Sequence, residues 1–158
     1  MMDNYGFYTG KSFDAYEFFG CHTDENGAVF RVFAPAAVRI SVIGEFNGWQ
    51  DTPMNKIGDG NFWAVYIEGV KPGQMYKYKI YKPDGSCMDH CDPYGYGMEL
   101  RPASASIVRN LYGYEFQDDA WMIKRSNRVA SALNIYEIHA GSWKKPQNGW
   151  YRYDELAT

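Results

Sequence analysis

The stretch Val38-Arg39-Ile40-Ser41-Val42-Ile43-Gly44-Glu45-Phe46-Asn47-Gly48-Trp49 joins an alternating segment to an Asn-Gly turn and a tryptophan. Its apolar side chains fall on every second position from Val38 to Val42, with Arg39 and Ser41 between them, which is the period of a half-buried β-strand. Asn and Gly both tolerate the left-handed backbone that tight turns require, so the pair after Phe46 predicts a reversal of the chain. The stretch therefore predicts a strand that ends in a turn and presents Trp49 just beyond it.

The same alternation recurs in other short segments of the chain. In Met75–Tyr81, tyrosine and isoleucine share one face, while Lys77 and Lys79 share the other. Trp63 begins an apolar face of its own and is expected in the core. The strands predicted in this way cover residues 28–33, 38–43, 62–67, 75–81 and 106–108. Short strands separated by Gly, Pro, Asn and Asp, without a convincing amphipathic helix, predict an all-β fold, an immunoglobulin-like β-sandwich.

The chain divides into four segments by sequence character. Residues 1–20 are a leader expected to pack by a few aromatic side chains, 21–110 form the sandwich, and 111–133 are a linker, in which residues 115–128 are either extended linker or a short helical turn. In 134–158, the segment Asn134-Ile135-Tyr136-Glu137-Ile138-His139-Ala140 predicts a new strand, and the following residues from 151 onward predict the start of a helix. This order is how an α/β domain opens, and the expected tail is the truncated start of such a domain, because the opening strand needs neighbours that the chain does not supply.

Composition narrows the class of partner. With 16 Lys and Arg against 19 Asp and Glu, the net charge is −3, which gives no electrostatic case for nucleic acid or an anionic membrane. Aromatic residues make up 18% of the chain, an excess that suits stacking on a neutral, hydroxyl-rich ligand. The first residues lack the pattern of a signal peptide, and no apolar run approaches the ~20 residues that cross a bilayer. We therefore expect a cytoplasmic protein.

A search for catalytic motifs gives no candidate catalytic residue. The sequence has no Gly-rich phosphate loop, nucleophile elbow or His-Glu-x-x-His motif. Glu137 and His139 alternate on the last predicted strand, and we expect neighbouring strands and loops to satisfy them. Five acidic residues lie beside Gly, Asn or Pro, where they are expected to support turns; these are Asp24, Glu25, Asp51, Asp59 and Asp84.

Three cysteines, an odd number, agree better with reducing conditions than with a disulfide framework. Cys87, His90 and Cys91 lie close together, but a structural zinc site needs four ligands at recognisable spacing. The remaining candidates are distant in the sequence, namely Cys21, His22 and His139. The sequence predicts neither a metal nor a cofactor.

Two interpretations of Trp49 follow from the residues alone. A tryptophan delivered by a turn can meet the flat apolar face of a sugar ring, or it can fold back onto the edge of the sandwich as packing. Lys77 and Lys79 present the same choice. Outward lysines on a strand usually serve solubility and edge protection, but beside the Trp49 turn their ammonium groups could donate hydrogen bonds to sugar hydroxyls.

Five ordered motifs resemble carbohydrate-binding module family 48, whose members precede the catalytic domain of glycogen and starch branching enzymes. The motifs are Arg31-Val32-Phe33-Ala34-Pro35, Gly44-Glu45-Phe46-Asn47-Gly48-Trp49, Tyr76-Lys77-Tyr78-Lys79, Asp92-Pro93-Tyr94 and Arg101-Pro102. The later stretch Ile135-Tyr136-Glu137-Ile138-His139-Ala140-Gly141-Ser142-Trp143 resembles the first strand of the (β/α)8 barrel in branching enzymes of glycoside hydrolase family 13.

The resemblance implies a parent enzyme of glycogen biosynthesis that transfers an α-1,4-glucan segment to a 6-hydroxyl, with retention through a glycosyl-enzyme intermediate. The catalytic carboxylates of that family lie on later barrel strands, and a whole barrel needs roughly 250 residues, so this chain is expected to be inactive by itself. Its implied partners are an α-glucan and its own catalytic barrel.

By the same resemblance Trp49 stacks on glucose, either Lys77 or Lys79 is the strand lysine that contacts sugar, and Asn47 belongs to the same binding turn. Related modules often carry a second tryptophan before Asp-Pro, where this chain has Ser86-Cys87-Met88-Asp89-His90. This absence motivates an alternative, in which the module docks on the barrel and stabilises it without binding sugar.

Overall fold

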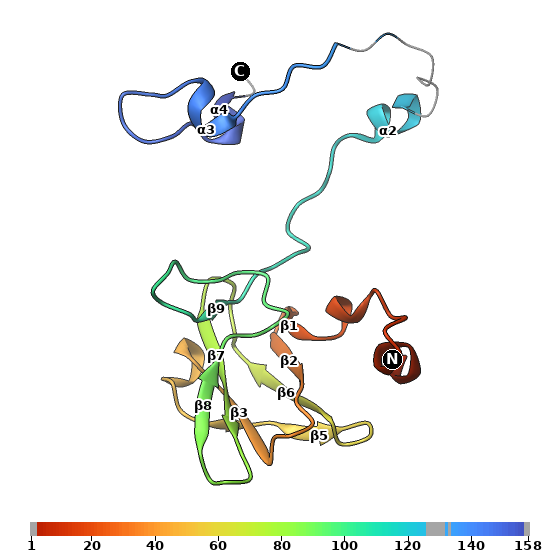
Figure 1. The fold of residues 1–158 in the computed structure, drawn as a ribbon, viewed down its shortest axis with the longest axis vertical. Helices are drawn as coiled ribbons and strands as arrows, with labels where there is room; N and C mark the ends of the chain where they lie inside the picture. Colours follow the sequence, from red (N-terminus) through yellow and green to blue (C-terminus); the bar gives the residue numbers. More distant parts are fainter. Residues whose placement is uncertain (1–2, 126–131, 133, 157–158) are drawn as a thin grey trace. The chain divides into compact units, whose positions relative to one another are not determined.

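The computed structural model describes residues 3–125, 132 and 134–156. The chain separates into two compact units, Met1–Tyr114 and Glu115–Thr158. The first unit contains two β-sheets with strand orders β1-β2-β6-β5 and β4-β3-β7-β8, and β9 also pairs with β7 (Figure 1). Every pairing is antiparallel. The structure thus confirms the predicted all-β sandwich.

The predicted strands are present with small changes at their ends. They are β2 (Gly27–Phe33), β3 (Arg39–Gly44), β6 (Phe62–Glu68), β7 (Met75–Tyr81) and β9 (Ser106–Ile107). The strand β3 begins one residue later than predicted, and the side chain of Val38 is 54% exposed instead of facing the core.

Four strands were not predicted from the sequence. They are β1 (Gly20–Thr23), β4 (Thr52–Pro53), β5 (Asn55–Ile57) and β8 (Cys87–His90). All four lie at the ends of the two sheets. They are short, and the pairing partner decides their conformation more than their own composition does.

The core lies between the two sheets and is rich in aromatic side chains. Phe30 from β2, Ile40 from β3 and Tyr78 from β7 are completely buried. Trp63 is also buried, as predicted, and its indole N–H donates to the carbonyl oxygen of Ala34 at 3.1 Å.

A buried carboxylate fixes one end of β7. Asp92 accepts hydrogen bonds from the hydroxyls of Tyr76 at 2.7 Å and Tyr78 at 3.0 Å, and from the backbone N–H of Tyr94 at 2.8 Å. Its own backbone N–H donates to the Ser106 hydroxyl at 2.8 Å. Burial raises the pKa of Asp92, while these hydrogen bonds oppose the rise.

The leader covers the outer face of the first sheet. The helix α1 (Asn4–Tyr8) lies on the side of β1 and β2 away from β7 (Figure 1). The ring of Phe7 lies 5.1 Å from those of Phe19 and Phe33 and 5.7 Å from that of Phe62, measured between centroids. The aromatic packing expected for this segment is confirmed, and the segment forms a third layer together with the 3-10 helix η1 (Ala15–Glu17).

The second unit contains three short helices, which are α2 (Asp119–Arg125), α3 (Ala140–Trp143) and α4 (Tyr153–Leu156). The helical turn predicted in the linker appears as α2, and the helix predicted near the end appears as α4. The strand predicted at 134–140 was wrong, because residues 134–139 pair with no strand among the described residues and α3 begins at Ala140. A strand is stable only when neighbouring backbone groups satisfy its hydrogen bonds.

Residues 126–131, 133 and 157–158, which fall within the predicted linker and tail, lie outside the described residues. None of the described helices is long and apolar enough to cross a membrane.

Candidate functional site

The Trp49 turn has an unusual backbone. After β3 the chain forms a 3-10 turn, η2 (Glu45–Asn47), and then two successive left-handed residues, Gly48 with φ 62° and Trp49 with φ 61°. The backbone N–H of Trp49 donates to the carbonyl of Gly44 at 2.8 Å and closes the loop. Among the described residues Trp49 is the one non-glycine with positive φ. A side chain in this region costs roughly 1–2 kcal/mol, and such strain is concentrated at functional positions.

The sequence predicted a left-handed backbone at Asn47 and Gly48. In the structure the two left-handed residues are Gly48 and Trp49, one position later. Asn47 is helical and acts through its side chain. Its Oδ1 accepts from the N–H of Gly44 at 2.9 Å, and its Nδ2 donates to the carbonyl of Val42 at 3.0 Å and to the hydroxyl of Thr52 at 2.8 Å. Both amide hydrogens are therefore used inside the turn, and Asn47 holds the loop that carries Trp49.

The Trp49 side chain is 41% exposed. Part of the residue is therefore open to contact and part is covered, so the exposure alone does not choose between the two sequence-based interpretations.

The strand register separates the two candidate lysines. Both face away from the core, because they alternate along β7 with Tyr76 and Tyr78, which are buried. Lys77 pairs with Ile43, next to the residue where the Trp49 turn begins, whereas Lys79 pairs with Ser41, two residues farther away. By register, Lys77 is therefore nearer to Gly44, where the turn begins.

Lys79 is already engaged by a carboxylate. Its ammonium lies 3.4 Å from Oδ1 of Asp51, and Oδ2 of Asp51 lies 3.8 Å from the guanidinium of Arg39. The hydroxyl of Tyr81 also donates to Asp51, and the Arg39 guanidinium lies 3.7 Å from the centre of the Tyr81 ring. We call Arg39, Asp51, Lys79 and Tyr81 the Asp51 cluster. For Lys77, no carboxylate lies within 4.0 Å among the described residues.

The Asp51 cluster has coupled titration behaviour. The hydrogen bond from Tyr81 lowers the pKa of Asp51, and the contacts with Lys79 and Arg39 lower it further. In turn Asp51 raises the pKa of Tyr81 and of Lys79. Asp51 therefore stays ionised at neutral pH.

The prediction that Asp51 supports a turn was wrong, because its carboxylate reaches across β3 to side chains of β3 and β7. Three other predicted turn carboxylates do accept backbone N–H groups, and these are Asp24 from Asn26, Asp59 from Asn61 and Asp84 from Ser86.

Ser41 lies on the same face as the Asp51 cluster but has no exposed surface. The sequence correctly predicted that Ile40 and Val42 face the core. It wrongly predicted that Ser41, on the opposite face of the strand, is exposed to solvent. In the described part of the chain, the Ser41 hydroxyl has no hydrogen-bond partner.

Among the described residues, no group of three His, Cys, Asp or Glu side chains is placed to hold a metal ion. Cys87 pairs with Tyr81 on the outer face of β8, whereas His90 pairs with the core residue Tyr78, so the two point to opposite sides. His139 does not line a strand, and its Nδ1 lies 2.8 Å from the hydroxyl of Ser142 at the start of α3.

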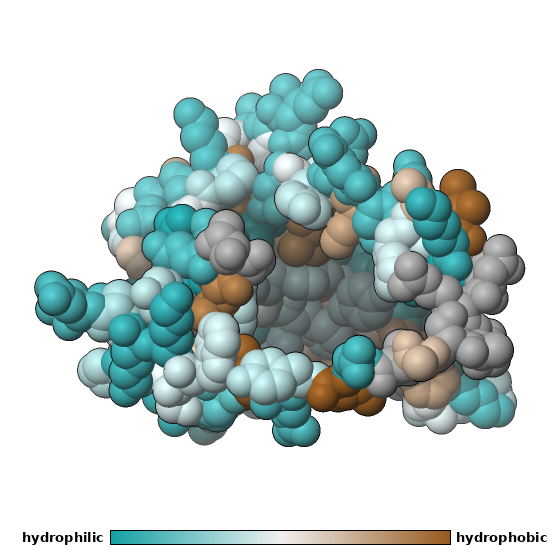
Figure 2. All heavy atoms as spheres, turned by 90° about the horizontal axis from the view of Figure 1, so that it is seen from above, coloured by the Kyte–Doolittle hydropathy of each residue, from teal (hydrophilic) through white to brown (hydrophobic). Residues whose placement is uncertain are grey.

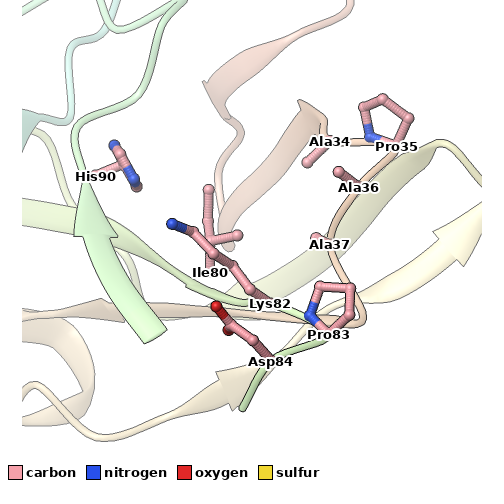
Figure 3. Close-up of a pocket in the computed structure, with 9 residues that line it drawn as sticks. All are labelled: Ala34, Pro35, Ala36, Ala37, Ile80, Lys82, Pro83, Asp84 and His90. Carbon is pink, nitrogen blue, oxygen red and sulfur yellow. The ribbon is translucent and has the colours of Figure 1, made fainter. Parts of the chain in front are cut away.

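A pocket of about 490 Å³ opens at the other end of β3. Its walls come from the β2–β3 loop, the end of β7 with the following loop, and β8 (Figure 3). The lining residues are Ala34, Pro35, Ala36, Ala37, Ile80, Lys82, Pro83, Asp84 and His90. Most of these side chains are apolar, which suits a sugar less well than the Trp49 face does. The view in Figure 2 shows a largely hydrophilic surface, on which the coloured hydrophobic residues form separate spots.

Comparison with known proteins agrees with this geometry. Residues 18–95 match the family model described as Carbohydrate-binding module 48 (Isoamylase N-terminal domain). The chain is 38% identical over 160 residues to 1,4-alpha-glucan branching enzyme GlgB of Fusobacterium nucleatum, and 39% identical over 165 residues to that of Geobacillus stearothermophilus. Each match covers 99% of this chain and 26% of the relative, so the chain spans about a quarter of the length of these enzymes.

Solved structures support the fold. A putative alpha amylase from Salmonella typhimurium aligns with a TM-score of 0.54 and 23% identity, over 65% of this chain and 16% of that one. Klebsiella pneumoniae pullulanase complexed with maltotriose aligns with a TM-score of 0.50 and 21% identity, over 58% and 9% of the two chains. Residues 18–95 therefore match the carbohydrate-binding module 48 family, within a chain whose sequence resembles that of 1,4-alpha-glucan branching enzymes over nearly its whole length.

Proposed function

We propose that the first unit binds α-glucan through Trp49 and Lys77 and holds it for the catalytic barrel of a cytoplasmic glycogen branching enzyme. The parent would cleave an α-1,4-glucan and transfer the segment to a 6-hydroxyl, and residues 134–158 would begin its barrel. The observation that carries the proposal is the strained, half-exposed Trp49, held by a turn on the sheet that presents Lys77.

In this proposal the indole face stacks on the C–H groups of a glucose ring, and Lys77 donates a hydrogen bond to its hydroxyls. Lys77 is favoured over Lys79 for two reasons. It lies nearer to the turn, and its ammonium is not held by Asp51. Asn47 contributes by fixing the loop, so its effect on the sugar is indirect.

Titration with maltoheptaose, followed by NMR, tests the proposal. We expect shifts at Trp49 and Lys77 at millimolar sugar, and Trp49→Ala should weaken binding about tenfold or more, as loss of a central aromatic contact does. Trp121→Ala is the matched control, because Trp121 is 50% exposed in the other unit. Absence of any response, or an unchanged affinity of the Trp49 variant, would refute the proposal.

The alternative function, structural support of the barrel, is favoured by one observation. The stretch 86–90 carries no tryptophan, and its two strand residues on the outer face are Cys87 and Asp89. This alternative predicts that the full-length enzyme loses stability when residues 1–110 are removed, whereas Trp49→Ala leaves both its stability and its activity unchanged. A barrel that is equally stable and active without the module would exclude it.

A further inference from the structure

We propose a second glucose-contacting subsite, formed by Arg39, Asp51 and Tyr81 and lying farther along the same sheet face than Trp49. This inference rests on the proposed glucan function and extends it to residues that the sequence did not single out. The first subsite would hold one end of a short glucan at Trp49 and Lys77, and the second would hold the chain as it continues along β7.

The strand geometry places both subsites on one surface. Lys77, Lys79 and Tyr81 alternate along β7 on the outer face, opposite Ile43, Ser41 and Arg39 of β3. Four residues of a strand span roughly 13 Å, so Tyr81 lies well beyond the first subsite and within reach of an oligosaccharide of several units. Asp51 follows Trp49 by two residues in the same β3–β4 connection.

The Arg39 guanidinium offers the flat surface that a sugar ring needs. It lies 3.7 Å from the centre of the Tyr81 ring, and its side chain is 52% exposed. A guanidinium held in this way keeps several N–H donors in a fixed plane. One face of Arg39 is thus supported by Tyr81, and the exposed part can contact a glucose ring and donate to its hydroxyls.

Asp51 supplies a hydrogen-bond acceptor beside the donors of Arg39. A sugar hydroxyl both donates and accepts, so it can enter between a carboxylate and an ammonium by bonding to each. The Asp51 carboxylate and the Lys79 ammonium are 3.4 Å apart, and about a third of each side chain is exposed. Its ionised state at neutral pH, described above, keeps Asp51 an acceptor.

The Ser41 hydroxyl is an independent sign of a polar site. It is fully buried and unpartnered within the described residues, and it lies on the same face of β3 as Arg39, opposite Lys79. A buried hydroxyl without a partner costs about 1–3 kcal/mol. When Lys79 turns toward a bound sugar, a ligand hydroxyl or a water molecule can reach Ser41 and supply that partner.

Calorimetric titration of the full chain with maltotriose and with maltoheptaose tests the second subsite. The wild type should bind maltoheptaose about fivefold more tightly than maltotriose, because the longer sugar engages two linked sites. Arg39→Ala should remove most of that difference and leave the maltotriose affinity within about twofold of wild type. Asp51→Asn should act in the same direction and provides a variant with nearly unchanged side-chain volume.

Lys56→Ala is the matched control, since Lys56 also lies over an aromatic ring, 5.1 Å from that of Trp63, but on a strand of the other sheet. It should change neither affinity. If the wild type binds both sugars equally through Trp49, or if Arg39→Ala and Asp51→Asn both keep the preference for maltoheptaose, the second subsite is refuted while the proposed function stands. If the wild type binds neither sugar, both proposals fail.

Discussion

Trp49 combines backbone strain with a half-exposed indole. Strained residues cluster at functional sites, and this tendency motivates the proposed contact between the indole and glucan. The sequence identified this tryptophan but not its conformation, because the Asn-Gly pair suggested that the left-handed residues were the two before it.

The strain at Trp49 can be measured with two variants that both remove the indole. Trp49→Gly should be more stable than Trp49→Ala by about 1 kcal/mol, because glycine adopts the positive φ without a Cβ clash. Urea denaturation followed by circular dichroism gives the difference, and both variants should lose glucan binding. Equal stability of the two variants would show that the left-handed conformation is not kept.

Two buried serines provide a test of the orphan hydroxyl. Ser41→Ala should leave the free energy of unfolding unchanged or raise it by up to about 1 kcal/mol, because the hydroxyl that is removed has no partner. Ser106→Ala should lower it by about 1–2 kcal/mol, because that hydroxyl accepts from the N–H of Asp92. Thermal and urea unfolding of both variants measure the contrast, and equal losses would show that Ser41 is paired in solution.

The pKa values of Asp51 and Asp92 should be shifted in opposite directions from that of an ordinary aspartate. The pKa of Asp51 is lowered, mainly by Tyr81, so the stability it contributes is present above its unfolded pKa and is lost as the pH falls through the folded pKa. The pKa of Asp92 is raised by burial, so its contribution is full below the unfolded pKa and is lost as the pH rises through the folded pKa.

Carboxyl carbon NMR across pH 2 to 7 should therefore find that the pKa of Asp51 lies below the ordinary aspartate value of about 3.9 and that the pKa of Asp92 lies above it. The variant Tyr81→Phe tests whether the hydrogen bond from Tyr81 causes the shift of Asp51. It should raise the pKa of Asp51 and leave the pKa of Asp92 unchanged. The reverse order of the two midpoints would contradict the geometry described for both sites.

At the scale of elements, the predictable strands are those whose own sequence alternates. The pattern of Met75–Tyr81 gave both its bounds and its outward lysines, because one face packs in the core and the other does not. The end strands β4 and β8 have no such pattern, and only their neighbours make them strands. The Asp51 cluster was missed for the same reason, since it depends on the pairing of β4 with β3 and of β3 with β7. The predicted strand at 134–140 failed because the described chain offers it no partner.

The leader packs on the sandwich through the rings of Phe7 and Tyr8. Phe7→Ala should lower the free energy of unfolding by about 2 kcal/mol, because it removes the ring that packs on Phe19, Phe33 and Phe62. Tyr5→Ala, in the same helix but with the side chain 71% exposed, should change it by less than about 0.5 kcal/mol. Denaturant unfolding compares the two, and an equally small effect of both would show that the leader does not stabilise the sandwich.

At the scale of the whole molecule, the family match begins at residue 18, whereas the structural unit includes α1 from Asn4 onward. The compact structural unit is thus larger than the region that matches the family. The chain spans only about a quarter of its relatives, so the module described here is one part of the enzyme proposed above. Sequence reasoning identified the sandwich, the tryptophan turn and the lysine face, while the choice of Lys77 over Lys79 required the strand register.

In the proposed second subsite, the contact between Asp51 and Lys79 competes with the sugar for the same groups. A sugar hydroxyl that enters between them replaces an existing attraction, so each exchange yields little net free energy. Single contacts of this kind are weak and reversible, and strong attachment arises only when many are made at once along a branched polymer. If both proposed subsites bind glucan, such a surface would hold a large glucan particle and still release any one of its chains.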